Sequence, residues 1–295
     1  MSRLIASKTI GQVATSSGGG AGSAEITASG ALANGDTVIV NSNGTVSAVS
    51  GSTSFVTGTE TVFEDGGFEA NQSRVAYDED QDKVVVLYRD TNNSNYGTCI
   101  VGTVNSSNNT ISFGSPVIFL SANTHPFSIV YDSTQQKCVI AYRDQNNYPV
   151  QQVATVSGNS ISFGSAAYPF GSNSSYALDL AYHATSGKVI VFGKDGGNSN
   201  TLRARVCTIS GTSISFGTNT QVDSITNAGN GVRLVSTSNN ILLCMFFDNN
   251  DYLKGNIITI SGTSITAASS SHTIEGSSIY NWQVDAVWHP AVSYF

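Results

Sequence analysis

Clusters of acidic side chains are the first residues in this sequence that suggest chemistry. One loop contains Asp78, Glu79, Asp80 and Asp82, and Asp248 and Asp251 form a second pair. Calcium needs six to eight oxygen ligands. In the next copy of the first loop these residues are replaced by Asp-Ser-Thr-Gln-Gln, and the glycine and distal glutamate of an EF-hand are missing. We interpret both loops as solvated turns, and we predict no metal site and no cofactor.

Histidine and cysteine give equally little support for a metal or redox centre. The four histidines are His125, His183, His272 and His289, and the four cysteines are Cys99, Cys138, Cys207 and Cys244. No two histidines have the spacing of a metal pair. His183 and His289 follow an aromatic residue where earlier copies have aspartate, so we predict that they cap turns. The cysteines lie within apolar runs without C-x-x-C spacing, which predicts buried free thiols.

Known catalytic patterns are missing from the sequence. A glycosidase needs a pair of carboxylates, and neither the sialidase box S-x-D-x-G-x-T-W nor a G-x-S-x-G elbow occurs. Arg89 and Arg143 occupy equivalent positions, but Lys194 and Phe247 follow in the next two copies, so no arginine cluster is expected. The segment GGGAGSAE lies in a linker-like context that does not support a dinucleotide site. We therefore predict no catalytic residues and a protein that is not an enzyme.

Asparagine and tyrosine gather in four variable loops, at residues 90–97, 144–150, 195–201 and 248–254. Variable loops on a rigid scaffold are the usual place for binding, and these side chains suit hydrogen bonding to sugars and stacking on them. The candidate ligand-binding residues are Asn92, Asn93, Tyr96, Asn147, Tyr148, Asn198, Asn249 and Tyr252. The alternative is that the Asp-x-Asn-Asn pattern only closes tight connections as Asx turns.

These loops belong to an internal repeat of about fifty residues. Ile-Ser-Phe-Gly occurs at 111–114, 161–164 and 214–217, with a degenerate copy at 265–268, at spacings of 50, 53 and 51. An aromatic run ending in aspartate recurs at 88–90, 142–144, 192–195 and 246–248. A third pattern begins as VAYD at 75–78, recurs at 129–132 and 180–183, and has weaker copies at 234–237 and 286–289. Three patterns with one period identify a repeat protein.

Each copy contains four predicted strands. In the second copy they span 127–132, 137–143, 150–156 and 160–170, as short apolar runs bounded by turn residues. Four antiparallel strands per fifty residues are typical of a β-propeller blade. The sequence thus predicts an all-β fold: four blades and a partial fifth, after a small N-terminal β module. Residues 52–63 resemble a lone outer strand that would complete the last blade. Because Phe295 lies within the fifth copy, we expect the polypeptide to continue.

The predicted domains are residues 1–50 and 51–295. The first contains a Gly-rich linker at 18–25 and a hairpin within 30–51, where Gly35-Asp36 and Asn43-Gly44 are turn signals. The second is the repeat domain. In it, the loop at 90–97 and its equivalents in later copies should lie on the same face as the connections between copies.

Charge and hydropathy exclude two classes of partner. The net charge is −7, and only 13 lysines and arginines are scattered along the chain. A basic stripe for nucleic acid and a polybasic membrane anchor are both missing. No apolar run approaches the length of a membrane span, and residues 1–20 lack the apolar core of a signal peptide. We predict synthesis in the cytoplasm, without membrane insertion.

Two stretches resemble proteins of tailed bacteriophages, notably marine ones. GALANGDTVIVNSNGTVSAVSG, at 30–51, resembles a module near the N-terminus of their structural proteins. The repeats, with KVVVLYRD followed by TISFG, resemble those of tail-fibre or tail-associated proteins. The resemblance implies a virion protein that docks to other virion proteins through its N-terminal module. It also implies binding to a host surface glycan or protein, and a homo-oligomer, expected to be a trimer.

Two alternative functions remain beside this one. The chain could be a purely structural decoration or collar protein whose propeller binds other viral subunits. It could also be a propeller glycosidase. Glycan binding separates the first reading from the second, and turnover of a bound glycan would support the third.

Overall fold

The computed structural model describes residues 5–6, 10–15, 22–32, 38–41, 43–48, 58, 60–64, 73–175, 177–225, 231–237, 240–277 and 285–286. The chain divides into two compact units, residues 1–57 and 58–295. The boundary falls seven residues after the predicted one at residue 50. Within the described residues, no helix is long and apolar enough to cross a membrane.

The N-terminal unit contains two small antiparallel sheets. One has the order β1 (Ile5–Ala6), β2 (Ile10–Thr15) and β3 (Gly22–Thr27), and the other pairs β4 (Val38–Val40) with β5 (Val46–Ala48). The second sheet confirms the predicted hairpin, with Gly44 at a φ of +80° in its turn. The linker prediction is wrong for its second half: Gly22 and the three residues after it lie in β3, because they pair with β2.

The second unit is built from antiparallel sheets that match the sequence repeats. We call them the first to fourth blades. The first contains β6 (Arg74–Asp78), β7 (Lys83–Asp90), β8 (Tyr96–Asn105), β9 (Thr110–Phe113) and β10 (Val117–Asn123). The second contains β11 (His125–Asp132), β12 (Lys137–Arg143), β13 (Pro149–Ser157) and β14 (Ser160–Phe163).

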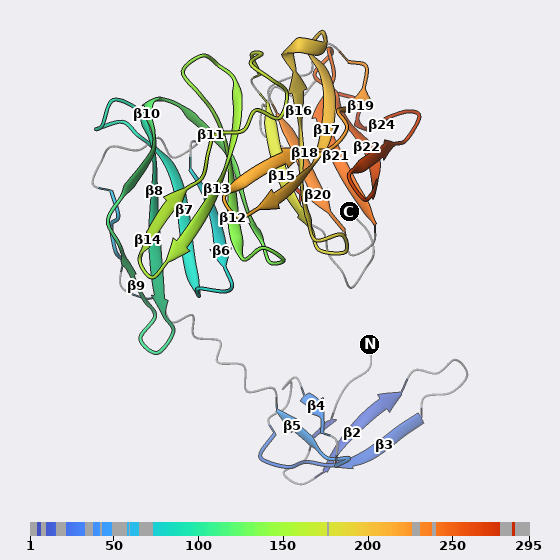
Figure 1. Ribbon diagram of the computed structural model, residues 1–295. Coiled ribbons are helices and arrows are strands. Elements are labelled where there is room, and N and C mark those ends of the chain that lie inside the picture. Colours follow the sequence, from blue (N-terminus) through green and yellow to red (C-terminus); the bar gives the residue numbers. More distant parts are fainter. Residues whose placement is uncertain are drawn as a thin grey trace. The chain divides into compact units, whose positions relative to one another are not determined.

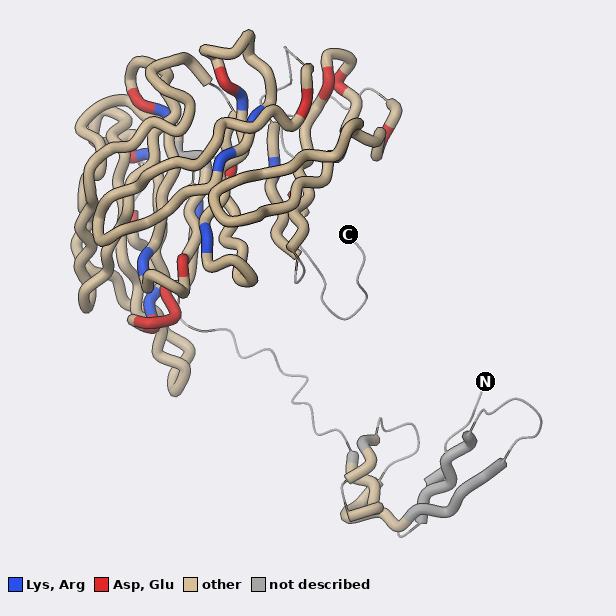
Figure 2. The backbone as a smooth tube through the Cα atoms, turned by 45° about the vertical axis from the view of Figure 1, so that its right-hand side comes forward, with Lys and Arg blue, Asp and Glu red and all other residues tan. Residues whose placement is uncertain are grey.

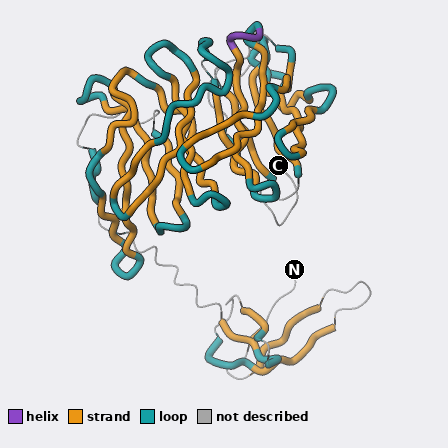
Figure 3. The backbone as a smooth tube through the Cα atoms, in the orientation of Figure 1, coloured by secondary structure: helices purple, strands orange, loops and turns teal. Residues whose placement is uncertain are grey.

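The third blade contains β15 (Leu178–His183), β16 (Lys188–Asp195), β17 (Thr201–Ser210), β18 (Ser213–Phe216) and β19 (Thr220–Asp223). The fourth contains β20 (Val232–Ser236), β21 (Ile241–Phe247), β22 (Leu253–Ser261), β23 (Ser264–Ala267) and β24 (His272–Glu275). Nearly all of the regular secondary structure described in this unit is strand, and loops lie at the two ends of the blades (Figures 1 and 3).

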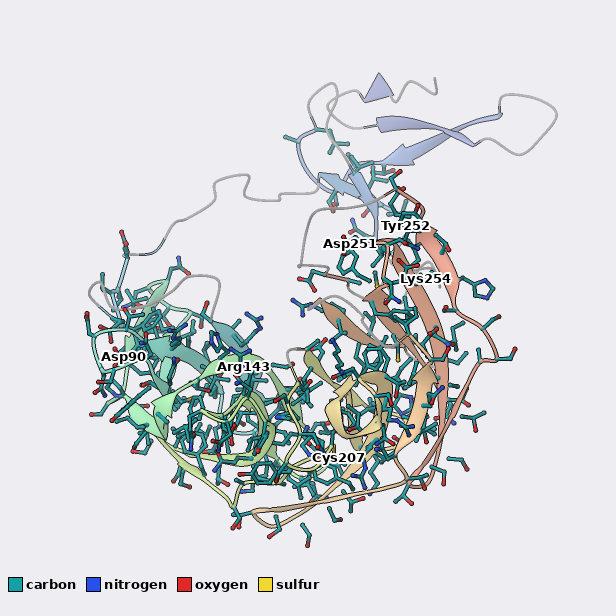
Figure 4. The ribbon with its side chains drawn as sticks, turned by 90° about the horizontal axis from the view of Figure 1, so that it is seen from above. Asp90, Arg143, Cys207, Asp251, Tyr252 and Lys254 are labelled. Carbon is teal, nitrogen blue, oxygen red and sulfur yellow. The ribbon has the colours of Figure 1, made fainter. Side chains whose placement is uncertain are left out.

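The blades pack face to face around an arc, with β6, β11, β15 and β20 in contact one after another on its inner side (Figure 4). The core therefore lies between blades. Leu87 of the first blade and Ile140 of the second belong to one buried cluster, and Phe192 of the third blade packs with Phe246 of the fourth. All four cysteines are buried and free, as predicted. The all-β propeller prediction is confirmed.

The outer strand differs from the prediction, because it is not continuous over residues 160–170. It breaks into two pieces that pair in succession with the same neighbour, as β9 and β10 do with β8. The break follows the glycine of Ile-Ser-Phe-Gly. A Cβ on Gly114 would lie 2.1 Å from the backbone oxygen of Asn159 in the next blade. Gly164 and Gly217 meet the following blade in the same way, so a side chain is excluded there.

The lone outer strand predicted at 52–63 is partly described. A Cβ on Gly58 would overlap the backbone oxygen of Asn109, the same relationship that Gly114 has to the next blade. Five residues after each glycine, an aromatic ring packs against a tyrosine of the following blade. The ring centroids of Phe63 and Tyr88 are 5.5 Å apart, and those of Phe119 and Tyr142 are 4.8 Å apart. Residues 58–63 thus pack on the first blade as outer strands pack on later ones. Residues 51–57, 59 and most of the fifth copy, including His289, lie outside the described residues.

Candidate ligand-binding site

The predicted binding loops are held by the aspartate at which each begins. Asp90 Oδ1 accepts a hydrogen bond from Asn93 N at 3.0 Å. Asp144 Oδ1 accepts from Asn146 N at 2.9 Å and from Tyr148 N at 2.8 Å. These are Asx turns, and their chemistry accounts for the recurring aspartate without a ligand.

The third and fourth loops are closed in the same manner. Asp195 accepts from Gly197 N at 2.9 Å and from Asn198 Nδ2 at 2.6 Å. Asp248 Oδ1 accepts from Asn250 N at 2.8 Å and from Tyr252 N at 3.1 Å. Burial acts to raise the pKa of Asp248, but these N–H groups and Lys254 Nζ, 3.2 Å from Oδ2, outweigh it and lower the pKa.

The predicted loop residues lie on the surface but do not meet at one point. Asn92, Asn93, Asn198 and Asn249 are exposed, and Tyr96, Asn147, Tyr148 and Tyr252 are half-buried. Figure 4 shows Asp90 of the first loop and Tyr252 of the fourth at opposite ends of the arc. Any site in these loops would therefore be formed blade by blade. That these residues bind a ligand stays a prediction.

The other residues singled out from the sequence take structural positions. Asp78 Oδ1 accepts from Gln81 N at 3.1 Å, which closes its turn. His183 is fully buried, and its Nδ1 lies 2.8 Å from Ser186 Oγ, so it caps a turn as predicted. Charged residues of both signs are scattered over the described part of the repeat unit without a single-sign stripe (Figure 2).

A pocket of about 490 Å³ lies where the third and fourth blades meet. It is lined by Gln221, Val222, Asp223, Ser224, Ile225, Lys254, Asn256, Ala268, Ser269, Ser270 and Ser271. Asn256 is 1% exposed, and its Nδ2 donates to Val222 O at 2.8 Å. Among the described residues, Asn256 Oδ1 has no hydrogen-bond partner. A buried acceptor left without a donor is uncommon and calls for an explanation.

The repeat explains why the pocket exists at this boundary. Asn256 pairs with Cys244, four residues before Asp248, just as Arg205 pairs with Val191, four residues before Asp195. The two side chains thus hold equivalent positions in neighbouring blades.

In the third blade this position is filled by a large side chain. Arg205 Nη1 donates to Pro169 O at 2.7 Å, its Nε donates to Gly217 O at 2.9 Å, and its guanidinium lies 5.0 Å from the Phe216 ring centre. In the fourth blade, Ala267 stands in place of that phenylalanine. The shorter asparagine and alanine leave the space open. Sequence reasoning missed this site, although the aligned repeat already contains the Arg205 and Asn256 difference.

A second cavity, of about 210 Å³, lies on the inner side of the arc. Its polar lining comes from one equivalent position in each of the five copies: Arg74, Ser128, Asp179, Arg233 and Asp285. Asp179 is buried and accepts from Leu180 N and Leu234 N, both at 2.9 Å. Burial raises the pKa of Asp179, against the opposing effect of Arg233. Arg233 Nε lies 3.5 Å from Asp285 Oδ1.

Comparison with known proteins gives no family. No family model and no curated protein matches the chain. Among solved structures, a mutant of AofleA from Arthrobotrys oligospora is 8% identical, with a TM-score of 0.47, over 71% of this chain and 58% of that one. The exo-β-1,3-galactanase 1,3Gal43A from Clostridium thermocellum is 11% identical, with a TM-score of 0.47, over 74% and 52%.

A third structure, the periplasmic gluconolactonase of Pseudomonas aeruginosa, is 12% identical, with a TM-score of 0.39, over 71% of this chain and 74% of that one. The chain spans little more than half the length of the first two proteins. The likeness concerns the fold. It also corrects one prediction: enzymes are among the proteins with similar folds, so the statement that this chain is not an enzyme was wrong. A repeat architecture and missing motifs gave no ground for excluding catalysis.

Proposed function

We propose that the protein binds a saccharide in the pocket between its third and fourth blades. The observation that carries the proposal is Asn256, a buried amide that lines the pocket and whose Oδ1 has no hydrogen-bond partner among the described residues. A sugar hydroxyl can supply the missing donor. Polar groups that are paired only when a ligand is present are what give a hydroxyl-binding site its specificity.

The rest of the lining supports the same ligand class. Three consecutive serines from Ser269 to Ser271, with Gln221 and Asp223, offer both donors and acceptors, while Val222 and Ile225 provide apolar contact. Lys254 is already paired with Asp248, so the Asp223 carboxylate is the main charge that the lining offers. Concave sites with a few placed polar groups on a partly apolar wall are typical of small-ligand sites. A neutral or weakly charged sugar fits these groups.

We further propose that this binding serves a particle-attached protein of tail-fibre type. The support is the resemblance of residues 30–51 and of the repeats to phage structural proteins. In this role the N-terminal unit docks to other virion proteins, and the repeat unit presents its pocket and loops to a host surface glycan. The predicted trimer and the virion location belong to this proposal.

The pocket is tested by a variant that the repeat itself suggests. Asn256→Arg introduces the residue that fills the equivalent space in the third blade. A glycan array probed with the full chain should show binding by wild type and a loss of about tenfold or more in affinity for N256R. Ser215→Arg adds the same charge on an exposed strand and should bind as wild type does. Equal binding by N256R, or no binding by wild type, contradicts the proposal.

The second cavity favours glycoside hydrolysis as a further candidate function. Asp179 and Asp285 both line it, and burial raises the pKa of Asp179. Glycosidases use a pair of carboxyl groups, and a raised pKa is a property of the one that acts as the general acid. Release of reducing sugar from a glycan bound on the array, lost in both D179N and D285N, would support this function. Binding without release in the wild type leaves saccharide recognition alone.

A further inference from the structure

We infer that the saccharide bound beside Asn256 is an amino sugar, whose ammonium group pairs with the carboxylate of Asp223. The inference rests on the proposed saccharide binding and names the class of sugar that this pocket selects. It starts from the lining groups that still need a hydrogen-bond donor or a positive charge.

The amide of Asn256 can face only one way. Its Nδ2 lies 2.8 Å from Val222 O, and a carbonyl oxygen only accepts hydrogen bonds, so the amide nitrogen must face it. Oδ1 therefore points elsewhere, and it has no hydrogen-bond partner among the described residues. Asn256 is 1% exposed, so bulk water does not solvate this oxygen. The pocket thus contains a buried acceptor that requires a donor.

Asp223 supplies a second acceptor from the other side of the boundary between the blades. It is the last residue of β19 and lines the same pocket as Asn256. Its Oδ1 accepts a hydrogen bond from Ile225 N at 3.0 Å, and no hydrogen bond or ion pair within the described residues engages Oδ2. Asp223 is half-buried. A carboxylate that is partly withdrawn from water is stabilised by a cation in contact with it.

The cations near this pocket already have carboxylate partners. Lys254 Nζ lies 3.2 Å from Asp248 Oδ2. Arg203, in the strand that pairs with β19, has its Nε 3.9 Å from Asp195 Oδ2. Asp223 is therefore the carboxylate of this region that lacks a cation of its own among the described residues. A ligand with a positive charge can balance it, whereas a neutral sugar cannot.

An amino sugar can satisfy both acceptors at once. Its ammonium group carries three N–H donors and a positive charge, and hydrogen bonds between ionised groups are the stronger ones. A hydroxyl on the neighbouring ring carbon can donate to Asn256 Oδ1, and the three lining serines can pair with the remaining ring oxygens. The volume, about 490 Å³, lies within the range of about 300–1,000 Å³ for small-ligand sites.

Titration calorimetry with the full chain can compare glucosamine, glucose, N-acetylglucosamine and ethanolamine. At about pH 6 an amine of this kind is protonated, and EDTA in the buffer prevents a divalent cation from bridging. Glucosamine should bind about tenfold or more tightly than each of the other three compounds. Glucose lacks the charge, N-acetylglucosamine has lost it to an amide, and ethanolamine lacks the ring.

The outcomes separate this inference from the function on which it rests. If glucose or N-acetylglucosamine binds as tightly as glucosamine, the pocket binds saccharides but the amino-sugar inference is overturned. Ethanolamine binding as tightly as glucosamine also overturns it, because the pocket would then hold a plain ammonium group. If none of the three sugars binds, saccharide binding itself is contradicted.

Variants locate the charge. Asp223→Asn keeps the oxygen that accepts from Ile225 N and removes the charge. It should lower the affinity for glucosamine by about tenfold and leave that for glucose unchanged, whereas a merely structural role would lower both. Glu79→Gln removes the same charge from an exposed turn of the first blade and should bind as wild type does. An unchanged preference for glucosamine in D223N contradicts the inference.

A measurement on the wild-type chain covers the case in which D223N does not fold. Raising the pH until the amine of glucosamine is deprotonated should lower its affinity to that of glucose, because the ligand then loses its charge. The affinity for glucose should stay constant over the same range. A glucosamine affinity that does not fall with pH overturns the pairing with Asp223.

Discussion

Asn256 Nδ2 donates to the backbone oxygen of Val222 across the boundary between the third and fourth blades, at 2.8 Å. One boundary earlier, Arg205 makes the equivalent bond to Pro169 O at 2.7 Å. Val222 and Pro169 each follow the glycine of their own blade by five residues. The repeat thus uses one bond twice, with a long side chain in one blade and a short one in the next, and a pocket remains beside the short one.

We predict that exchanging these two residues has opposite effects on stability. Arg205→Asn removes the bonds to Pro169 O and Gly217 O and the contact with Phe216, so the free energy of unfolding should fall by about 2–4 kcal/mol. Asn256→Arg fills space and gains acceptors, so it should leave this free energy unchanged or raise it. Urea unfolding of the two variants checks both. A larger loss in the free energy of unfolding for N256R than for R205N would contradict the equivalence of these two positions.

The repeat glycines should tolerate no side chain. Gly164→Ala places a Cβ 1.9 Å from Thr212 O, and Gly217→Ala places one 2.0 Å from Thr263 O. Overpacking against backbone costs about 1–3 kcal/mol or more. Gly276→Ala is the matched control, because its Cβ would meet only Thr273 Cγ2 at 3.8 Å. Thermal melts should separate the first two variants from the third, and equal melting temperatures would refute close packing between blades.

The loop aspartates should stabilise the fold through the hydrogen bonds that they accept more than through their charge. Asp144→Ala leaves Asn146 N and Tyr148 N without their acceptor, and we expect a loss of about 1–3 kcal/mol in the free energy of unfolding. Asp144→Asn keeps an acceptor oxygen and should lose less.

Alanine at Asn92, Tyr148 and Tyr252 together should reduce adsorption to cells if the loops bind a ligand. Unchanged adsorption with an intact fold would remove the loops from the proposed site.

Stability should rise with pH between about pH 4 and pH 6.5 because of His125. Burial, with the nearby positive charges of Arg143 and Arg89, lowers the pKa of His125 from 6.5 to about 4. In that window the unfolded chain binds more protons than the folded one, so raising the pH favours folding, and the effect is complete above pH 6.5. His125→Gln should reduce the slope. Urea unfolding across this window measures it, and an equal slope in H125Q would show that other groups cause it.

The sequence anticipated those parts of the site that depend on neighbours along the chain. The Asp-x-Asn-Asn loops close as Asx turns because Asp144 bonds N–H groups two and four residues away. The buried cysteines follow from apolar runs that could only lie in a core. The second half of the predicted linker, residues 22–25, was misjudged because small and polar residues give no strand pattern there, and the strand form of β3 depends on pairing with β2. The exclusion of catalysis was a mistake of inference from missing motifs.

The sequence by itself did not show that the outer strand breaks into two pieces. It did determine the period, the three inner strands of each copy and the turns between them. These follow from local hydrophobic alternation and turn chemistry, repeated often enough to be read by alignment. The tertiary structure decided which residues meet. Arg74 and Arg233 are 159 positions apart in the sequence, and they line one cavity because the blades place the same register position at the same radius. The pocket beside Asn256 likewise exists because packing between blades sets the space that each side chain must fill.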